Sequence, residues 1–182
     1  MSAMRSDIQR PRDGAGPLNH RTYRVHIESA ARTPEEIVAA FRRKPNDFSP
    51  TSFATFDPPL GPDGMTVGDQ VTIRLPGPWD GPVVVSEVGP GMVKLETLET
   101  HMEAGWICFT ATLDEHELTF EIESFARSGD PLFDALYHPG RVGRFVQTEM
   151  WVRVLEAVVA FSGGKPIGRV IVDTTIYEGQ DK

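Results

Sequence analysis

The sequence predicts an α+β domain in which a curved antiparallel sheet is wrapped around a long C-terminal helix. Two observations lead to this fold class. Between Val67 and Phe125, short runs of alternating apolar and polar residues are separated by turn-forming residues, which is typical of a meander of five strands. From Arg141 to Phe161, apolar residues recur at helical spacing, and a helix of that span is about 31 Å long. Such a helix could cross a whole sheet, because a strand of eight residues is about 27 Å long.

The N-terminal part predicts a tail followed by a strand and a helix. Residues 1–19 mix glycine, proline and charges without an apolar run, so we expect a flexible tail. From Arg21 onward, apolar and polar residues alternate as in a strand with one buried face. Thr33 and Glu36 then form a capping box, with Pro34 at the first helical position. Residues 46–64 predict either a loop or one short helix.

The C-terminal end predicts an extension of the main domain. The pair Gly163-Gly164 should end the long helix, so we place the domain at residues 20–164 and an extension at 165–182. Residues 170–177 are rich in β-branched side chains and predict one added strand. This strand could pair with a sheet edge of its own chain or of a second copy, so a homo-oligomer formed through it is one hypothesis.

Composition excludes several classes of protein. The chain has 182 residues, with 18 Lys and Arg against 26 Asp and Glu, and its net charge of -8 argues against nucleic-acid binding. The longest apolar stretch, residues 152–161, is too short for a membrane span and contains Arg153 and Glu156. Cys108 is the only cysteine, so no internal disulfide forms, and we expect a cytoplasmic protein. Because Cys108 lies between apolar residues, we expect it to pack as a small hydrophobic side chain rather than act as a nucleophile.

The order of elements and one motif resemble a known family. Strand, helix, loop, meander and long helix follow each other as in the START-like (SRPBCC) helix-grip fold, in which an apolar cavity often remains between sheet and helix. The run from Thr97 to Gly105 resembles the Thr-Leu-x-x-His-x-Glu-x-Gly signature of the uncharacterised DUF1990 family. The resemblance covers about residues 82–160. Glu96, Trp106 and Ser128 depart from the family pattern.

Two residues of this motif are the candidates for catalysis. His101 and Glu103 could approach each other in a turn, so that the carboxylate orients the imidazole as in acid–base sites. The alternative is that both satisfy backbone groups of a tight turn that Gly105 closes. The sequence contains no phosphate loop, nucleophile elbow or zinc-type cysteine pair, which favours a non-enzymatic protein and implies no cofactor.

Other residues are candidates for ligand binding. Arg127 could bind an anionic group at a cavity mouth, or it could pair with Glu103, Glu123 or carbonyl groups. No metal site is expected, because four further histidines are dispersed along the chain: His20, His26, His116 and His138. Four apolar residues should face the space between sheet and helix and would line any pocket there: Phe109, Phe120, Phe145 and Trp151.

Three functions follow as hypotheses. The first is a protein that binds a small hydrophobic molecule between the sheet and the C-terminal helix. The second is a START-like enzyme of the cyclase, dehydratase or hydrolase type that uses His101 and Glu103, although a shared fold is a weak argument for a shared reaction. The third is a protein-interaction module that uses the C-terminal strand.

Overall fold

The structure, a computed structural model, describes residues 7–50, 52, 54–57, 60–74, 80–129 and 142–178, without the side chains of residues 142–147. It contains one antiparallel sheet and two α-helices in this part of the chain. The sheet order is β2-β3-β4-β5-β6-β7-β1-β8, and β9 also pairs with β1. The strands are β1 (Ala15–Glu28), β2 (Thr55–Asp57), β3 (Gln70–Arg74), β4 (Asp80–Gly89), β5 (Met92–Thr97), β6 (Glu103–Asp114), β7 (Glu117–Ser128), β8 (Lys165–Pro166) and β9 (Ile171–Tyr177).

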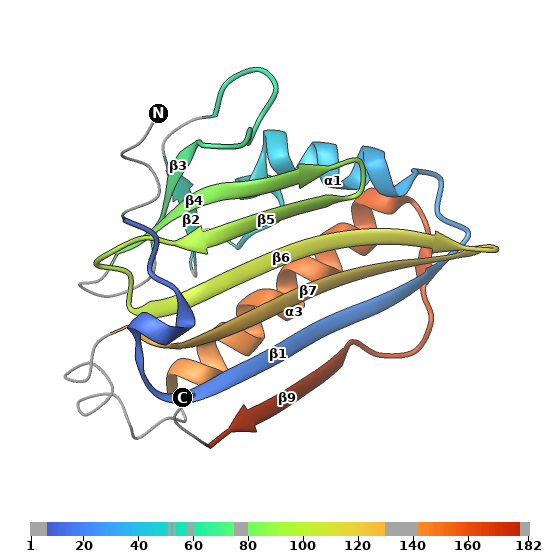
Figure 1. The fold of residues 1–182 in the computed structure, drawn as a ribbon. Coiled ribbons are helices and arrows are strands. Elements are labelled where there is room, and N and C mark those ends of the chain that lie inside the picture. The colour runs from blue at the N-terminus through green and yellow to red at the C-terminus, as the bar shows by residue number, and fades with distance from the viewer. Residues whose placement is uncertain are drawn as a thin grey trace.

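The sheet curves around the helix α3 (Val142–Ser162), as Figure 1 shows. Strands β3 to β7 form the five-strand meander that the sequence predicts. Strand β1 closes the meander by pairing with β7 from Glu28 to Ala15. The predicted fold class is therefore confirmed, and the predicted long helix is present as α3, which ends one residue after Phe161; Arg141 lies outside the described residues.

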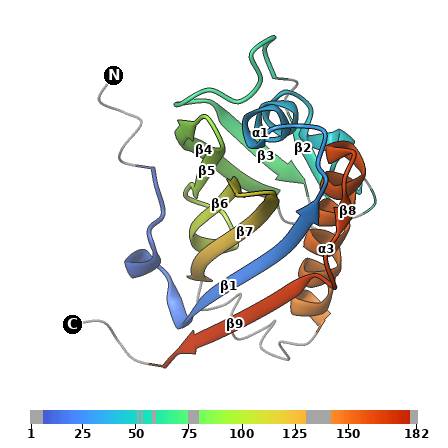
Figure 2. The ribbon, with the colours of Figure 1, turned by 90° about the vertical axis from the view of Figure 1, so that its right-hand side faces the viewer.

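The alternation of side chains along each strand decides which face of the sheet is buried. In β7, Leu118, Phe120 and Ile122 point to the concave face and are fully buried, whereas Thr119 and Glu121 point to the convex face. Helices α1 (Pro34–Arg43) and α3 both cover the concave face (Figure 2). This face therefore forms the core of the domain.

Helix α1 begins at the predicted capping box. The Thr33 side chain accepts a hydrogen bond from the Glu36 backbone N–H, and the Glu36 carboxylate accepts one from the Thr33 backbone N–H at 2.7 Å. These two bonds satisfy donors that the first helical turn leaves unpaired. The helix then buries Ile37, Val38 and Phe41 against the sheet.

The residues before β1 correct the expectation that ordered structure begins at Arg21. Strand β1 already begins at Ala15, and residues 7–14 lie along the ends of β5 and β6. Gln9 donates its backbone N–H to the Thr97 carbonyl at 2.8 Å, and the Thr97 hydroxyl donates to the Gln9 carbonyl at 2.9 Å. Backbone bonds of this kind need no apolar pattern, so no local pattern indicates them.

Two further segments differ in part from the sequence-based expectation. In residues 46–64, a short strand, β2, pairs with β3, where we expected a loop or a helix. The added strand expected at residues 170–177 is present as β9, which pairs with β1 of its own chain.

The close packing at Gly105 gives a prediction about stability. A Cβ atom at Gly105 would overlap the carbonyl oxygen of Phe125 on the neighbouring strand, and backbone cannot move as a flexible side chain can. We expect Gly105→Ala to lower the free energy of unfolding by about 2 kcal/mol or more, measured by urea denaturation. Gly61→Ala is the matched control, because no atom lies within 4 Å of the added Cβ there. Equal stability of the two variants would contradict the packing described at Gly105.

Candidate ligand site between the sheet and the C-terminal helix

Three aromatic side chains join the sheet to both helices. Phe109 on β6 is fully buried and packs against Phe41 of α1, with ring centroids 4.6 Å apart. It also meets Trp151 of α3 edge-on, at 5.6 Å. Because interiors pack to crystal-like density, these contacts describe a filled core at this level of the fold.

The residues expected to line a pocket divide into three groups. Phe109, Phe120 and Trp151 lie between sheet and helix as predicted, and all three are buried in the core. The side chain of Phe145 lies outside the described residues. Arg127 follows the convex-face positions of β7, so it lies on the side of the sheet away from α3. An anionic group bound between sheet and helix would therefore be out of its reach.

A groove of about 480 Å³ opens at the margin of this core. Its floor is Val25 of β1, and one wall is the face of α3 that carries Val152, Glu156 and Val159. The other wall is the chain segment 166–170, which connects β8 to β9. In Figure 2 the chain runs from the end of α3 past β8 to the start of β9.

A mismatch in register produces the groove. Lys165 pairs with Glu28 and Ile171 pairs with Arg24, so six steps along the extension match only four steps along β1 (171 − 165 = 6; 28 − 24 = 4). The two surplus residues bulge away from the strand opposite Val25. Gly168 permits the bulge, because its φ of +72° lies in the left-handed region, which favours glycine.

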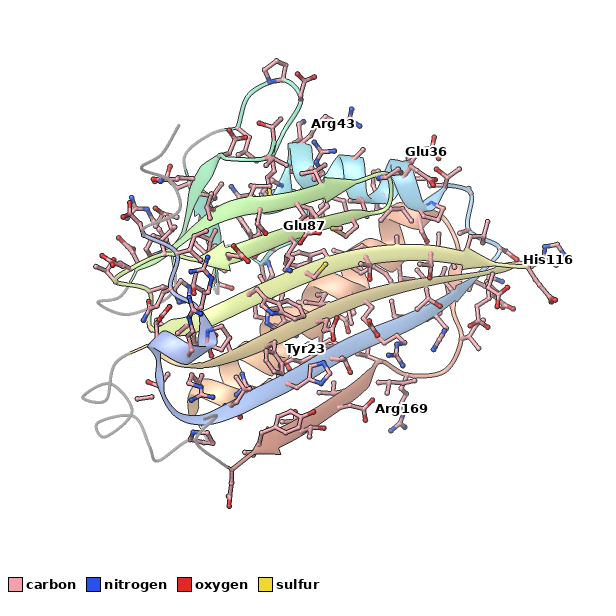
Figure 3. All side chains as sticks on the ribbon, in the orientation of Figure 1. Tyr23, Glu36, Arg43, Glu87, His116 and Arg169 are labelled. Atoms are coloured by element: carbon pink, nitrogen blue, oxygen red, sulfur yellow. The ribbon has the colours of Figure 1, made fainter. Side chains whose placement is uncertain are left out.

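The lining of the groove is mostly apolar, with two charged groups at its rim. Val25, Val152, Val159, Pro166 and Val170 supply apolar surface. Glu156 on α3 and Arg169 on the connecting segment are both exposed to solvent, and Figure 3 shows Arg169 close to the start of β9. Such a surface could hold an apolar molecule and contact one polar substituent.

A polar cluster lies next to the groove on the concave face. Tyr23 stands two residues before Val25 on β1 and is hydrogen bonded to the side chain of Thr148, one helical turn before Val152. Burial raises the pKa of Tyr23, against smaller lowering effects of that hydrogen bond and of Arg21. The Arg21 side chain is 11% exposed, and its guanidinium Nη1 lies 3.8 Å from the Glu103 carboxylate.

His101 and Glu103 are close in space, but their contacts have different roles. The Nδ1 atom of His101 accepts a hydrogen bond from the Glu103 backbone N–H at 2.8 Å, while the Glu103 carboxylate extends toward Arg21. The other ring nitrogen, Nε2, lies 2.8 Å from the position that a Cβ on Gly81 would occupy. These contacts support the interpretation in which His101 satisfies the backbone of a turn; a catalytic role for the pair stays a hypothesis.

The sequence did not identify Arg21 and Tyr23 as site residues, although a signal was present. Arg21 shares its strand parity with Tyr23, Val25 and Ile27, so a strand that buries those three also turns Arg21 toward the concave face. A charged side chain at a core-facing position is a candidate for function. The contribution of residues 166–170 had no such signal, because it depends on long-range pairing.

The remaining titratable candidates lie away from the groove. Cys108 is on the convex face, where burial raises the pKa of its thiol to about 11, so the thiolate that a nucleophile needs is disfavoured. His20 contacts Glu123 at 2.7 Å, and His26 contacts Glu117 at 2.7 Å. His138 lies outside the described residues. In the part of the chain that is described, no three His, Cys, Asp or Glu side chains gather as metal ligands would, and no helix is long and apolar enough to cross a membrane.

Comparisons with known proteins show the fold. No protein-family model and no curated protein matches the sequence, so the resemblance to DUF1990 stays a prediction. Norcoclaurine synthase from Thalictrum flavum, solved in complex with dopamine and hydroxybenzaldehyde, superposes with a TM-score of 0.56 at 11% identity, covering 80% of this chain and 87% of that one. The major latex-like protein 151 of Panax ginseng gives a TM-score of 0.54 at 12% identity, covering 81% and 99%.

A third similar structure is the hypothetical protein jhp0584 from Helicobacter pylori, with a TM-score of 0.55 at 10% identity over 78% of this chain and 86% of that one. At such identities the likeness concerns the fold alone. These neighbours have Bet v1-like or START-like folds, and the chain described here has the same helix-grip architecture.

The burial of His101 gives a prediction about pH. Burial lowers the pKa of His101, although the Glu103 carboxylate acts in the opposite direction. The folded state therefore binds fewer protons than the unfolded state just below the ordinary histidine pKa of about 6.5. The stability that comes from burying the neutral His101 is therefore complete above about pH 6.5, and it is lost as the pH falls toward the lowered pKa of His101.

His101→Asn removes the titrating group and keeps an acceptor for the Glu103 N–H. We expect its free energy of unfolding to fall less steeply than that of the wild type between about pH 7.5 and 5.5, by at most about 1.4 kcal/mol per pH unit. Urea denaturation at several pH values measures the slope. His116→Asn, at the tip of the β6–β7 hairpin in Figure 3, should keep the wild-type slope. If both variants keep it, His101 does not control the acid sensitivity.

Proposed function

We propose that this protein binds a small hydrophobic molecule in the groove between β1, α3 and segment 166–170. The observation that carries the proposal is the groove itself: an apolar space of about 480 Å³ that reaches the core residue Val25. Its volume lies within the range of about 300–1,000 Å³ of ligand sites in proteins. The site lies between sheet and helix, as expected for a ligand of this fold, but at the edge of the core.

The chemistry of the lining defines the class of ligand. Val25, Val152 and Val159 offer apolar contacts, so the body of the ligand should be aliphatic or aromatic. Arg169 and Glu156 at the rim can each contact one polar substituent that stays in water. Similar architecture in norcoclaurine synthase, which was solved with two small aromatic molecules, supports the proposal at the level of the fold.

A second candidate function is an enzymatic one, and it depends on the polar cluster beside the groove. Tyr23 lies two residues before the groove floor at Val25, and Glu103 approaches the same concave face from the start of β6, farther from the groove. A carboxylate and a buried phenol on the face that holds a ligand are groups that can transfer protons. The START-like enzyme considered from the sequence would thus use Glu103 with Tyr23, and His101 would orient the turn that carries Glu103.

Two finer assignments remain part of this proposal. Membership in DUF1990 rests on the run from Thr97 to Gly105, and the cytoplasmic location rests on the single cysteine. Neither is needed for ligand binding in the groove.

Filling the groove tests the proposal. Val152→Phe places a larger side chain on the groove wall, and the probe is 8-anilinonaphthalene-1-sulfonate, whose rings suit the apolar lining and whose sulfonate suits Arg169. We expect the dissociation constant of the variant for this dye to be about tenfold or more above that of the wild type, because the added ring occupies the binding volume. Fluorescence titration measures the constant.

Thr112→Phe is the matched control. Thr112 is exposed on the convex face of β6, so the same side chain is added away from the groove. It should leave dye binding unchanged. Equal affinity of the wild type and both variants would place any dye site elsewhere and contradict the proposal. Native mass spectrometry of protein from its own host can then identify the natural ligand.

A further inference from the structure

Among the described residues, strand β9 pairs on one side only, with β1, and it is exposed along its whole length. All seven of its residues are exposed. Of the seven large apolar side chains that are exposed in the described residues, four belong to this strand, and they are 40–49% exposed: Ile171, Val172, Ile176 and Tyr177. A concentration of exposed apolar residues on one short segment indicates a contact surface.

The free edge of β9 lacks the features that normally prevent strand pairing. It contains no proline and no lysine, and its register with β1 is continuous from Ile171 to Tyr177. At the opposite edge of the sheet, β2 is only three residues long, and its Asp57 is ion-paired with Arg74 of β3 at 2.9 Å. Short, charged edge strands are a common protection against pairing. The chain thus protects one edge of the sheet and leaves the other open.

The sequence of β9 is complementary to itself in an antiparallel arrangement. When two copies of the strand are centred on Thr174, Val172 faces Ile176 of the second copy and Ile171 faces Tyr177. Asp173 faces Thr175, so no like charges are opposed. Pairs of β-branched and aromatic residues in such positions stabilise a sheet.

Other registers are less favourable. Centring the pair on Asp173 would oppose two carboxylates, which is destabilising. A shift by one residue would turn the concave face of one copy toward the convex face of the other, because side chains alternate along a strand. In the register centred on Thr174, Glu178 faces Val170 of the second copy, so no like charges oppose each other at the ends of the pair.

We propose that two copies of this chain pair antiparallel through the free edge of β9, with the two-fold axis at Thr174. The sheet of one copy then continues into that of the other, and the concave faces stay on the same side. A contact made by one seven-residue strand is small beside the 1,200–2,000 Å² or so of a stable interface, so the dimer should be weak and concentration-dependent. This inference is independent of ligand binding in the groove.

Charge substitutions at Thr175 test both the contact and its register. In the Thr175→Asp variant, the new carboxylate of each copy faces Asp173 of the other copy, so the dimer contains two such repulsive pairs. We therefore expect the dissociation constant of the dimer to rise about tenfold. The double variant Asp173→Lys with Thr175→Asp places opposite charges face to face and should restore the dimer. Sedimentation velocity at protein concentrations from about 5 to 500 μM measures the dissociation constant, because this range includes the values expected for so small an interface.

Thr112→Asp on the convex face is the matched control, because it changes the net charge equally and lies away from β9. It should dimerise as the wild type does, and circular dichroism should show that all variants are folded. A wild type that stays monomeric over the whole range overturns the inference. So does a dimer that is insensitive to Thr175→Asp, since it would be formed through another surface.

Discussion

The contact of α3 with the concave face of the sheet is the interaction on which the rest of the structure depends. Trp151 packs against Phe109, and Phe109 packs against Phe41 of α1, so one buried aromatic residue of the sheet holds both helices. Burying side chains of this size is worth several kcal/mol each. This centre is filled, and the groove lies at its margin, between β1, α3 and segment 166–170.

The margin of the core combines features that the centre lacks. There the extension after α3 has two more residues than the part of β1 that it spans, so it bulges away from the strand. The floor of the resulting groove is the core residue Val25. The buried Tyr23 lies two residues from that valine on the same face, and the ion pair of Arg21 with Glu103 lies farther along it, toward the start of β6. The extension also carries the open strand edge, so the same short segment shapes the groove and offers a contact surface on the opposite side of β9.

Most of the fold could be predicted from the sequence, because its signals are local. Alternation defined the meander, the capping box defined the start of α1, and apolar spacing defined α3. The site was harder to predict. Counting from Leu118, Phe120 and Ile122 would have placed Arg127 on the convex face, but the groove arises from a register between distant segments, which no local pattern encodes. The order of residues 7–19 rests on backbone hydrogen bonds and was missed for the same reason.

Nuclear Overhauser effects between the Trp151 indole and the Phe109 ring, in the isotope-labelled protein, test the central contact most directly. With ring centroids 5.6 Å apart, protons of the two rings must come close enough to give cross-peaks. Observing them would establish that α3 lies in the concave face of the sheet. If Trp151 instead gives cross-peaks only within its own helix, the helix is not held by the sheet, and neither the filled core nor the groove at its margin exists as described.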